Sequence, residues 1–451
     1  MAEYNLKRGF DIKLVGEAES VIDDGFRPET IALNTGSLRG VKLKPLVKPG
    51  DTVKIGSPLC QSKENDAWVF TSPNSGTVKE VIRGARRVLE SFVIQVDNEY
   101  ESILFDHFKQ SDLSTVMRED AMELLLMSGQ LANFRERPFD YTANPEHMPR
   151  DIFVSTFDTA PLAADPNMIV EGNEVYFQAG LDICSVLTSG KVHLGIDSDR
   201  KDISEAFAHA RNVQVNRFSG PHPAGLVGVQ IHHVAPINGR EDYVWTISVH
   251  GLIQIGRLFT TGNISPDMIV AVAGAGASNR KHFRTVLGAP IDSLVELEEG
   301  EQRIISGNVL TGKKVDPENY IGFYDNLITV IPEVTSPEFI GWMLPGGEKQ
   351  SYFKAFLSHM FPGKKFNQNT CMNGGDRAFV STGLYEDVLP MDIYPLYLVK
   401  SIRAGDIDEM EQLGIYEVSE EELALCEYIC PSKGTFMKDI RNGLDLIEKE
   451  G

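Results

Sequence analysis

The chain has 451 residues, of which 42% are hydrophobic and 24% charged, values that exclude a mainly disordered chain or a fibrous repeat. Acidic residues outnumber basic ones by 64 to 43, so the formal net charge is −21, which disfavours binding to nucleic acid or to anionic lipid headgroups. No apolar stretch approaches the roughly 18 residues of a membrane-spanning helix, and neither a signal peptide nor a disulfide framework is indicated. We therefore expect a cytoplasmic protein that reaches a membrane through a protein partner, without direct lipid insertion.

Residues 1–105 are predicted to form a β-rich barrel-sandwich domain, similar to biotinyl and lipoyl domains. Two motifs, V-K-P-G-D-T-V at 47–53 and T-S-P-N-S-G-T-V at 71–78, place proline and glycine turns between β-branched residues. In carriers of this fold a modified lysine lies on the hairpin between the motifs, and Asn65 stands at that position here. The barrel is therefore expected to be structural, and a carrier function is the disfavoured alternative.

Residues 106–255 are predicted to form a Rossmann-like α/β domain. We expect a helix over 112–130 and an ordered loop over 135–150, where proline and arginine are frequent. From residue 151 strand-like and helix-like stretches alternate, which favours a mostly parallel sheet. Its buried strands are expected at 152–156, 192–196 and 213–215, with a helix at 203–210.

A glycine-rich loop in this domain, S-G-P-H-P-A-G-L-V-G at 219–228, is the most unusual local sequence. Glycines let a backbone approach another group closely, so we predict contact with a ligand or a partner chain. The residues proposed for that contact are Gly220, His222, Gly225 and Gly228. The histidines of this region lack metal-ligand spacing, and no metal site is predicted.

Residues 256–335 are predicted to form a small α+β module of the β-grasp kind, and residues 336–451 a helical domain. Helices are expected at 394–403 and 406–413, and S-E-E-E at 419–422 has the spacing of a capping box. The fold class is thus multidomain, with α/β and α+β parts.

Two glycine motifs in the module are incomplete. Residues 274–279 lack the third glycine of a dinucleotide-binding fingerprint, and residues 307–314 lack the hydroxyl that a phosphate loop presents to magnesium. We interpret both as turns, which weakens any prediction of a bound nucleotide.

The cysteines Cys426 and Cys430 match the end of the ferredoxin pattern C-x2-C-x2-C-x3-C-P. The two preceding ligand positions hold Glu420 and Leu423. A second run, ending at Pro390, has no cysteine at its four ligand positions, which are Phe379, Thr382, Tyr385 and Leu389. Because a four-iron cluster needs four thiolates or close substitutes, we expect a ferredoxin-like helical domain without clusters. Two chance cysteines in a helix are the alternative that spacing leaves open.

The whole chain resembles the A subunit of the bacterial sodium-translocating NADH:quinone reductases. The motifs that carry the resemblance are F-T-S-P-x-S-G-T-V at 70–78, R-G-A-x-R-V-L at 83–89, F-x-G-P-H-P-A-G-L at 218–226, L-P-M-D-I at 389–393 and L-A-L-C-x-x-x-C-P at 423–431. That family is similar in architecture to the C subunit of Rnf complexes and to the NADH-binding flavoprotein subunit of respiratory complex I.

The resemblance implies a peripheral subunit of a six-subunit complex, seated against the membrane-embedded B subunit on the cytoplasmic face of the bacterial inner membrane. It implies no firmly bound redox group, so FMN, FAD and iron–sulfur clusters are not expected, and it implies quinone as a ligand. The alternative is an electron-transfer subunit that carries flavin or a cluster, as the Rnf and complex I relatives do.

A quinone site needs an apolar cleft with hydrogen-bond donors for the two carbonyl oxygens. Two segments, 32–39 and 131–139, combine apolar residues with donors. The donors proposed are Asn34, Arg39, Arg135 and Arg137, and the rings proposed to stack on the quinone are Phe134 and Phe139. The alternative for the arginines is that they face solvent or form ion pairs.

Overall fold

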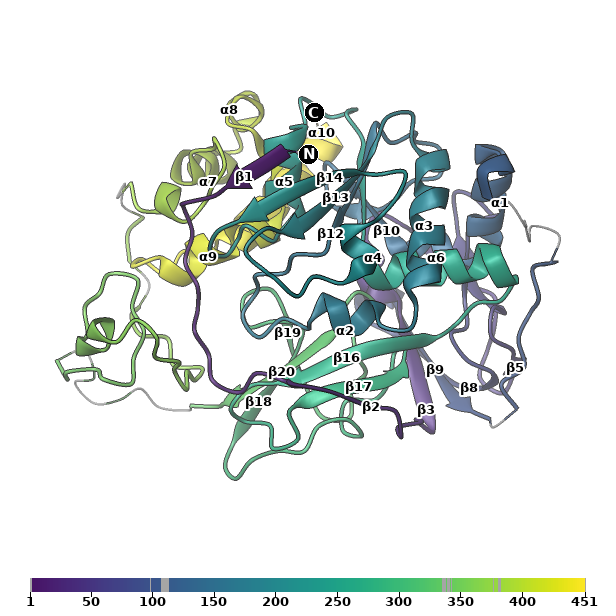
Figure 1. Ribbon diagram of the computed structural model, residues 1–451, viewed down its shortest axis with the longest axis horizontal. Coiled ribbons are helices and arrows are strands. Elements are labelled where there is room, and N and C mark those ends of the chain that lie inside the picture. The colour runs from purple at the N-terminus through teal and green to yellow at the C-terminus, as the bar shows by residue number, and fades with distance from the viewer. Residues whose placement is uncertain are drawn as a thin grey trace.

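A seven-stranded sheet forms the centre of the α/β region in the computed structural model, which describes residues 2–97, 99–106, 113–334, 338, 341, 343–375, 377–379 and 383–450 (Figure 1). Its strand order is β1-β14-β13-β12-β15-β10-β11, and the first five strands are parallel. The order β14-β13-β12-β15 is that of a Rossmann half, as predicted. The strands are β1 (Ala2–Asn5), β10 (Phe134–Arg137), β11 (Tyr141–Thr142), β12 (Asp151–Ser155), β13 (Val192–Asp197), β14 (Gln214–Ser219) and β15 (Val244–Ile247).

Side chains of the central strands alternate between two separate hydrophobic clusters, because successive residues of a strand face opposite sides of the sheet. Ile152 and Val154 belong to a cluster with helices α3 (Glu174–Leu187) and α6 (Val249–Thr261). Phe153 belongs to a second cluster, with α5 (Val227–Val234) and the C-terminal helices. Both faces of the sheet are therefore covered. The short helices α2 (Pro166–Val170) and α4 (Glu205–Ala208) complete this region, and α4 lies within the predicted 203–210.

The segment before this sheet differs in part from the prediction. The helix expected over 112–130 is α1 (Arg118–Ser128), which ends at Gly129 with a φ of 75°. Residues 135–150, predicted as a loop, contain most of the hairpin of β10 and β11, so that prediction is wrong there. The charged residues of β10 hid the strand, since Glu136 and Arg137 are buried despite their charge.

The N-terminal barrel contains two sheets, in the orders β3-β9-β8-β5 and β4-β6-β7. Its strands are β3 (Thr30–Asn34), β4 (Leu43–Pro45), β5 (Thr52–Val53), β6 (Pro58–Ser62), β7 (Val69–Thr71), β8 (Gly76–Arg83) and β9 (Leu89–Val96). The first 23 residues lie elsewhere: β1 pairs with β14, and β2 (Glu19–Asp23) pairs with β17. The N-terminal strands thus tie the barrel to both larger sheets.

A six-stranded sheet, β19-β18-β20-β16-β17-β2, forms the α+β module. Its remaining strands are β16 (Asp267–Ala273), β17 (Lys281–Val286), β18 (Gln302–Ser306), β19 (Lys313–Val315) and β20 (Leu327–Pro332). Helix α6 extends into the range predicted for this module, since it ends at Thr261. The domain limits at residues 105, 255 and 335 stay predictions.

The C-terminal helices pack beside the Rossmann sheet and are α7 (Pro395–Ala404), α8 (Ile407–Gln412), α9 (Glu420–Ile429) and α10 (Phe436–Glu450) (Figure 1). The helices predicted at 394–403 and 406–413 and the capping box at Ser419 are confirmed. The described residues between 338 and 379 include one 3₁₀ turn, Leu357–Met360, and no α-helix, so the helical prediction is wrong for them. No helix among the described residues is both long and apolar enough to span a bilayer.

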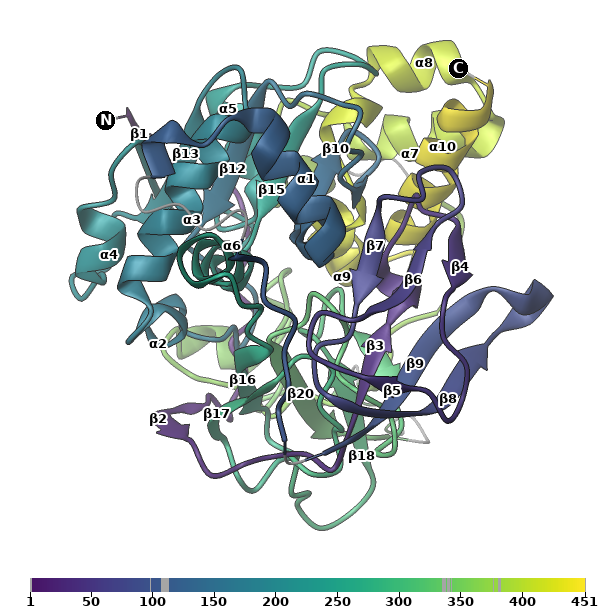
Figure 2. The ribbon, with the colours of Figure 1, turned by 90° about the vertical axis from the view of Figure 1, so that its right-hand side faces the viewer.

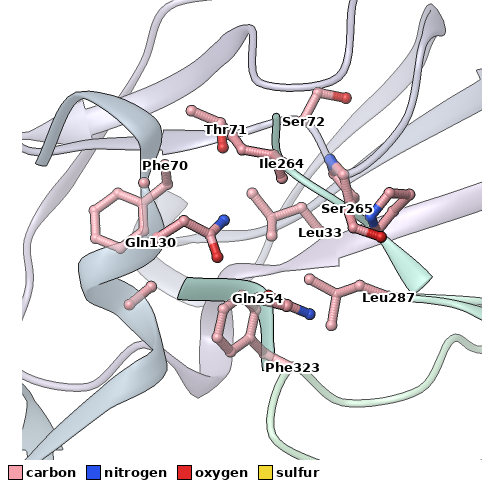
Figure 3. A pocket seen from close by; sticks show the side chains of 14 residues that line it. Leu33, Phe70, Thr71, Ser72, Gln130, Gln254, Ile264, Ser265, Leu287 and Phe323 are labelled. Atoms are coloured by element: carbon pink, nitrogen blue, oxygen red, sulfur yellow. The ribbon is translucent and has the colours of Figure 1, made fainter. Parts of the chain in front are cut away.

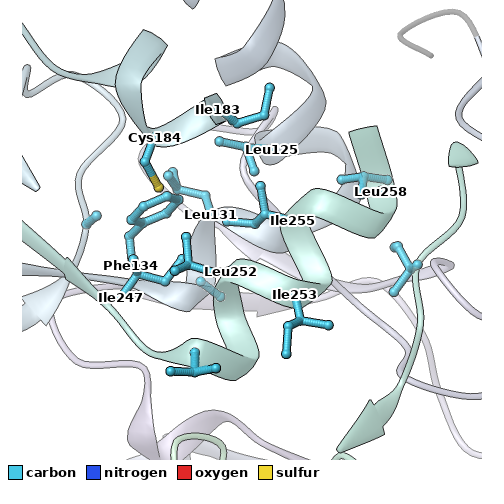
Figure 4. Packing of buried hydrophobic residues seen from close by; sticks show 14 of the residues in the cluster. Leu125, Leu131, Phe134, Ile183, Cys184, Ile247, Leu252, Ile253, Ile255 and Leu258 are labelled. Atoms are coloured by element: carbon cyan, nitrogen blue, oxygen red, sulfur yellow. The ribbon is translucent and has the colours of Figure 1, made fainter. Parts of the chain in front are cut away.

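Helices α3 and α6 pack against each other in a hydrophobic cluster (Figure 4), and glycines in their contact let the two backbones approach closely. A Cβ added at Gly180 would overlap the carbonyl of Leu252, and one added at Gly256 would overlap the carbonyl of Tyr176. Cys184 of α3 is fully buried in the same cluster. Backbone-to-backbone packing of this kind fixes α6, and with it Gln254, relative to the sheet.

We predict that Gly256→Ala destabilises the protein although alanine favours helix by about 1 kcal/mol over glycine. Overpacking of a core contact costs roughly 1–3 kcal/mol, and here the opposing group is backbone that cannot move aside. The midpoint of thermal unfolding should fall by several degrees, whereas Gly36→Ala, whose added Cβ meets nothing within 4 Å, should leave it unchanged. A Gly256→Ala midpoint at or above that of the wild type would contradict the prediction.

Candidate ligand-binding recess and the charged cluster beside it

Arg137 of β10 is the centre of a buried charged cluster. Its side chain is 3% exposed and lies 2.7 Å from Glu421 Oε1 and 3.2 Å from Glu422 Oε2. Asp140 forms ion pairs with both Arg135 and Arg137, and Arg39 donates to Glu420 at 2.6 Å. We call this set, completed by Arg441, the arginine–carboxylate cluster; its members are Arg39, Arg135, Arg137, Asp140, Glu420, Glu421, Glu422 and Arg441.

The cluster shifts the pKa values of its acids in opposite directions. Burial and the neighbouring Glu422 raise the pKa of Glu421 to about 7, with Arg137 and Arg135 opposing the shift. Burial would raise the pKa of Asp140 as well, but Arg135 and Arg137 outweigh it and lower that pKa. The surroundings therefore favour the ionised form of Asp140 and disfavour that of Glu421.

The residues predicted to bind quinone come only partly together. Arg39, Arg135 and Arg137 meet in the cluster, where they form ion pairs, the alternative named for them. Phe139 packs there too, with its ring 6.1 Å from those of Tyr141 and Tyr416.

The other two predicted residues lie apart from the cluster. Phe134 faces the opposite side of β10, fully buried against Trp245 with ring centroids 5.3 Å apart. The Asn34 side chain donates to the carbonyl of Ile321 at 2.8 Å. The six side chains therefore do not line one cavity.

A recess does open between the barrel, helix α6 and the six-stranded sheet (Figure 3). The space inside it that is free for solvent is about 30 Å³, room for a few water molecules and well below the roughly 300–1,000 Å³ of ligand pockets, so a larger ligand enters only when the walls move apart. The two segments predicted to hold the quinone-binding residues, 32–39 and 131–139, both reach the recess. They do so through Leu33 and Ala132, and not through the side chains that were predicted to bind the quinone. No charged side chain lines the recess, whose residues are Leu33, Phe70, Thr71, Ser72, Pro73, Gly129, Gln130, Ala132, Gln254, Ile264, Ser265, Pro266, Leu287 and Phe323.

Two amides give this apolar recess its polar character. Asn133 Nδ2 donates to the side-chain and backbone oxygens of Gln130, at 2.9 and 3.2 Å, and lies at the longer distance of 3.5 Å from Gln254 Oε1. The Nε2 groups of Gln130 and Gln254 make no hydrogen bond to another described residue. Both glutamine side chains line the recess, so two amide donors stand in a mainly apolar space (Figure 3).

Sequence reasoning missed both glutamines. Gln254 could have been found, since it is a buried polar residue between Ile253 and Ile255 on an apolar helix, and buried polar groups need partners. Gln130 follows the helix-ending Gly129 and carries no comparable signal.

The predicted glycine-rich loop contacts the chain's own segments. The nitrogens of Leu6 and Phe10 donate to the carbonyls of Ser219 and His222, and His222 N donates to Asp11 Oδ1 at 2.9 Å. A Cβ at Gly220 would overlap the Leu6 carbonyl.

The far end of the loop is equally close to other segments. A Cβ at Gly225 would overlap the Phe157 carbonyl, and one at Gly228 would overlap the Glu422 carboxylate. The glycines thus permit close contact with the N-terminal segment and with α9.

The two degenerate cluster runs face each other in the helical domain. The Tyr385 hydroxyl lies 3.1 Å from Cys430 Sγ, and Cys426 Sγ donates to the Tyr385 carbonyl at 3.7 Å. The Phe436 ring is 4.8 Å from that of Tyr385, so aromatic rings pack against the two thiols. Burial raises the pKa of the Cys426 thiol, which disfavours a metal-binding thiolate. Within the described residues, no group of three His, Cys, Asp or Glu could hold a metal.

Family models match three parts of the chain. The model of the NqrA N-terminal barrel-sandwich hybrid domain matches residues 4–97, which confirms the predicted barrel. The NqrA second alpha/beta domain matches residues 116–264, and the NQRA C-terminal domain matches residues 269–316.

Full-length relatives match the whole chain. The A subunit of the Na(+)-translocating NADH-quinone reductase of Pasteurella multocida is 40% identical over 449 residues, 99% of each chain. Those of Vibrio parahaemolyticus and Vibrio anguillarum are 40% and 41% identical over the same share. Among solved structures, a chain of NAD+-reducing [NiFe]-hydrogenase in the air-oxidized state aligns with a TM-score of 0.37 at 10% identity, over 76% of this chain and 66% of that chain, too low a score to carry an argument.

The buried His222 gives a prediction about pH. Burial lowers the pKa of His222 to about 4, from 6.5, so the unfolded chain binds this proton more tightly than the folded chain does. The stability that His222 contributes is complete above about pH 6.5 and is lost as pH falls towards 4, by up to about 3 kcal/mol.

Asn in place of His222 keeps an acceptor for Thr159 Oγ1 but cannot take up this proton. In the His222→Asn variant the free energy of unfolding, measured with urea, should therefore fall less between pH 6.5 and 4.5 than it does in the wild type. The matched variant His209→Asn changes a side chain that is 77% exposed and should keep the wild-type profile. Identical profiles for His222→Asn and the wild type would refute this assignment.

Proposed function

Because the chain belongs to the family of the A subunits of the Na(+)-translocating NADH-quinone reductases, we propose that it works as the peripheral subunit on the cytoplasmic face of the bacterial inner membrane. In this proposal it docks on the membrane-embedded B subunit of a six-subunit complex, without lipid insertion, and carries no redox group of its own. The net charge of −21 supports docking through a protein, since it opposes contact with anionic lipids.

We further propose that the recess holds a quinone ring. The observation that carries this is the pair of Nε2 donors, from Gln130 and Gln254, in an uncharged space lined by Phe70 and Phe323. A quinone is a flat, apolar, neutral ring with two acceptor oxygens, so its chemistry matches this lining, and the side chains of the recess must move apart to admit it. A donor at each carbonyl oxygen also stabilises the negative charge that develops there on reduction.

The arginine–carboxylate cluster is the second position for the ring. Its cations Arg39, Arg135 and Arg137 are strong donors, and Phe139 stands beside them. Their ion pairs with the glutamates of α9 would have to break or be shared before a quinone could use them, at a cost that the free amides of the recess avoid.

The experiment titrates the purified chain with a short-chain quinone and follows binding calorimetrically. Gln130→Leu and Gln254→Leu keep side-chain size but remove one donor each, so each should weaken binding by about five- to tenfold, roughly 1 to 1.4 kcal/mol. Gln412→Leu, at an exposed position of α8, is the control and should bind as the wild type does.

Phe139→Ala decides between the two positions, because it weakens binding only if the ring lies at the cluster. Unchanged affinity in both glutamine variants, with a loss in Phe139→Ala, would move the site to the cluster. Unchanged affinity in all three would overturn both positions, and absence of binding by the wild-type chain would overturn quinone binding by this chain.

A separate measurement tests the alternative of an electron-carrying subunit. The chain purified alone should be colourless and free of iron, because the remnant has two buried thiols packed against Tyr385 where four ligands are needed. The visible absorption spectrum and an iron assay check this, and samples that have been bleached or chemically reduced serve as controls. A flavin or iron–sulfur spectrum would make the chain an electron carrier in its own right.

A further inference from the structure

The hairpin of β8 and β9 projects from the barrel as a narrow two-stranded extension (Figure 2). Its end, residues 83–88, which we call the arm, carries Arg83, Arg86 and Arg87, all exposed, together with Val88, which is 60% exposed. On a chain with a net charge of −21, three arginines within five residues reverse the charge locally.

The arginines of the arm have no carboxylate partner within the described part of the chain. Their side chains make one hydrogen bond there, from Arg83 Nη1 to the carbonyl of Arg87 at 3.4 Å. Elsewhere many arginines are ion-paired, for example Arg284 with Asp24, while other exposed arginines, such as Arg27 and Arg211, also have no carboxylate partner among the described residues. What distinguishes the arm is that three such arginines lie within five residues on a chain with a net charge of −21, an arrangement that favours binding of an external anion.

The backbone of the arm supports the same conclusion. Val88 N donates to the Ala85 carbonyl at 3.2 Å around two residues with positive φ, Arg86 at 54° and Arg87 at 61°. This is the φ pattern of a type I′ turn, for which Asn-Gly is the preferred pair and long side chains are disfavoured. The two arginines therefore do not stabilise the turn in which they lie.

A second turn in the molecule shows what compensates such a conformation. Phe139 and Asp140 also have consecutive positive φ values, 79° and 56°. There Asp140 is ion-paired to Arg135 and Arg137, and Arg441 Nη1 donates to the Phe139 carbonyl at 2.9 Å. Among the described residues nothing plays that role for the arm.

We propose that the arm docks on an acidic segment of a neighbouring subunit, with the guanidinium groups of Arg86 and Arg87 bound to carboxylates and Val88 covered between them. This inference rests on the proposed assembly of the chain into the reductase complex. Arginine binds carboxylates through two parallel hydrogen bonds and is enriched at protein interfaces.

A protein partner fits the arm better than a lipid surface does. Membrane-binding basic segments typically carry about 4–8 lysines or arginines, whereas the arm has three arginines and is flanked by the acids Glu80 and Glu90. A turn fixed in an unfavourable conformation also suits a fixed array of carboxylates, while mobile headgroups require no particular geometry.

The test uses the full chain expressed with the other subunits, and the complex is purified through a tag on one of them. Arg86→Glu/Arg87→Glu should lower the recovery of this chain by about tenfold or more, because like charges then face each other. Arg86→Asn/Arg87→Gly places the favoured turn pair in the arm, so it should raise the midpoint of thermal unfolding and still lose the chain from the complex. Lys201→Glu/Arg211→Glu makes the same charge change at exposed positions elsewhere and should leave recovery unchanged.

Each outcome is decisive. If the wild type and both arm variants are fully recovered with the complex, the proposed docking of the arm is wrong and the proposed assembly of the chain into the complex stands. Absence of the wild-type chain from the purified complex overturns the proposed assembly and this inference with it. Binding of the wild type and of the arm variants to vesicles that contain phosphatidylglycerol is measured as well. If the wild type binds the vesicles, and the arm variants do not bind them but stay in the complex, the arm is a lipid contact and the proposal is wrong.

Discussion

The buried pair of Arg137 and Glu422 is the interaction on which the arrangement of the chain depends. Glu422 accepts from Arg137 and from both the backbone and the hydroxyl of Ser419, so one carboxylate caps α9 and fixes it to β10. Removing Arg137 would leave the Glu422 carboxylate buried without an ion-pair partner among the described residues, a loss of roughly 3–5 kcal/mol. The same carboxylate lies against Gly228, which has no room for a side chain. The helical domain, the Rossmann sheet and the glycine-rich loop therefore meet at one ion pair.

The cluster keeps its charges apart from the recess. The arginines that chemistry would first nominate as donors are paired with carboxylates in the cluster, and no charged residue is among the described residues that line the recess. The donors of the recess are amides, which suit a neutral ligand better than a phosphate or a carboxylate. A neutral quinone agrees with this division, whereas a nucleotide would require cations that the recess lacks.

The sequence predicted the barrel and the parallel strands because each leaves a local signature, such as turn motifs or apolar runs. It also nominated the two segments that reach the recess. It could not choose the side chains, because that choice depends on partners far along the chain. Arg137 is separated from Glu422 by 285 residues, and the direction in which Phe134 points follows from its place on β10, a strand that its charges concealed. Gln130 and Gln254 form a pair only once α6 is packed.

One segment of the chain connects the recess with the proposed arm. Pro73 lines the recess, and three residues later β8 begins at Gly76 and runs to Arg83 in the arm, paired with β9. Eight residues of strand span about 25 Å, and the pairing shifts register twice on the way, between Val78 and Glu80 and again at Arg83, so the ladder is bent there. A neighbouring protein that holds the arm would therefore act on the recess wall formed by residues 70–73 through a bent strand. Docking and ligand binding would then share this single strand.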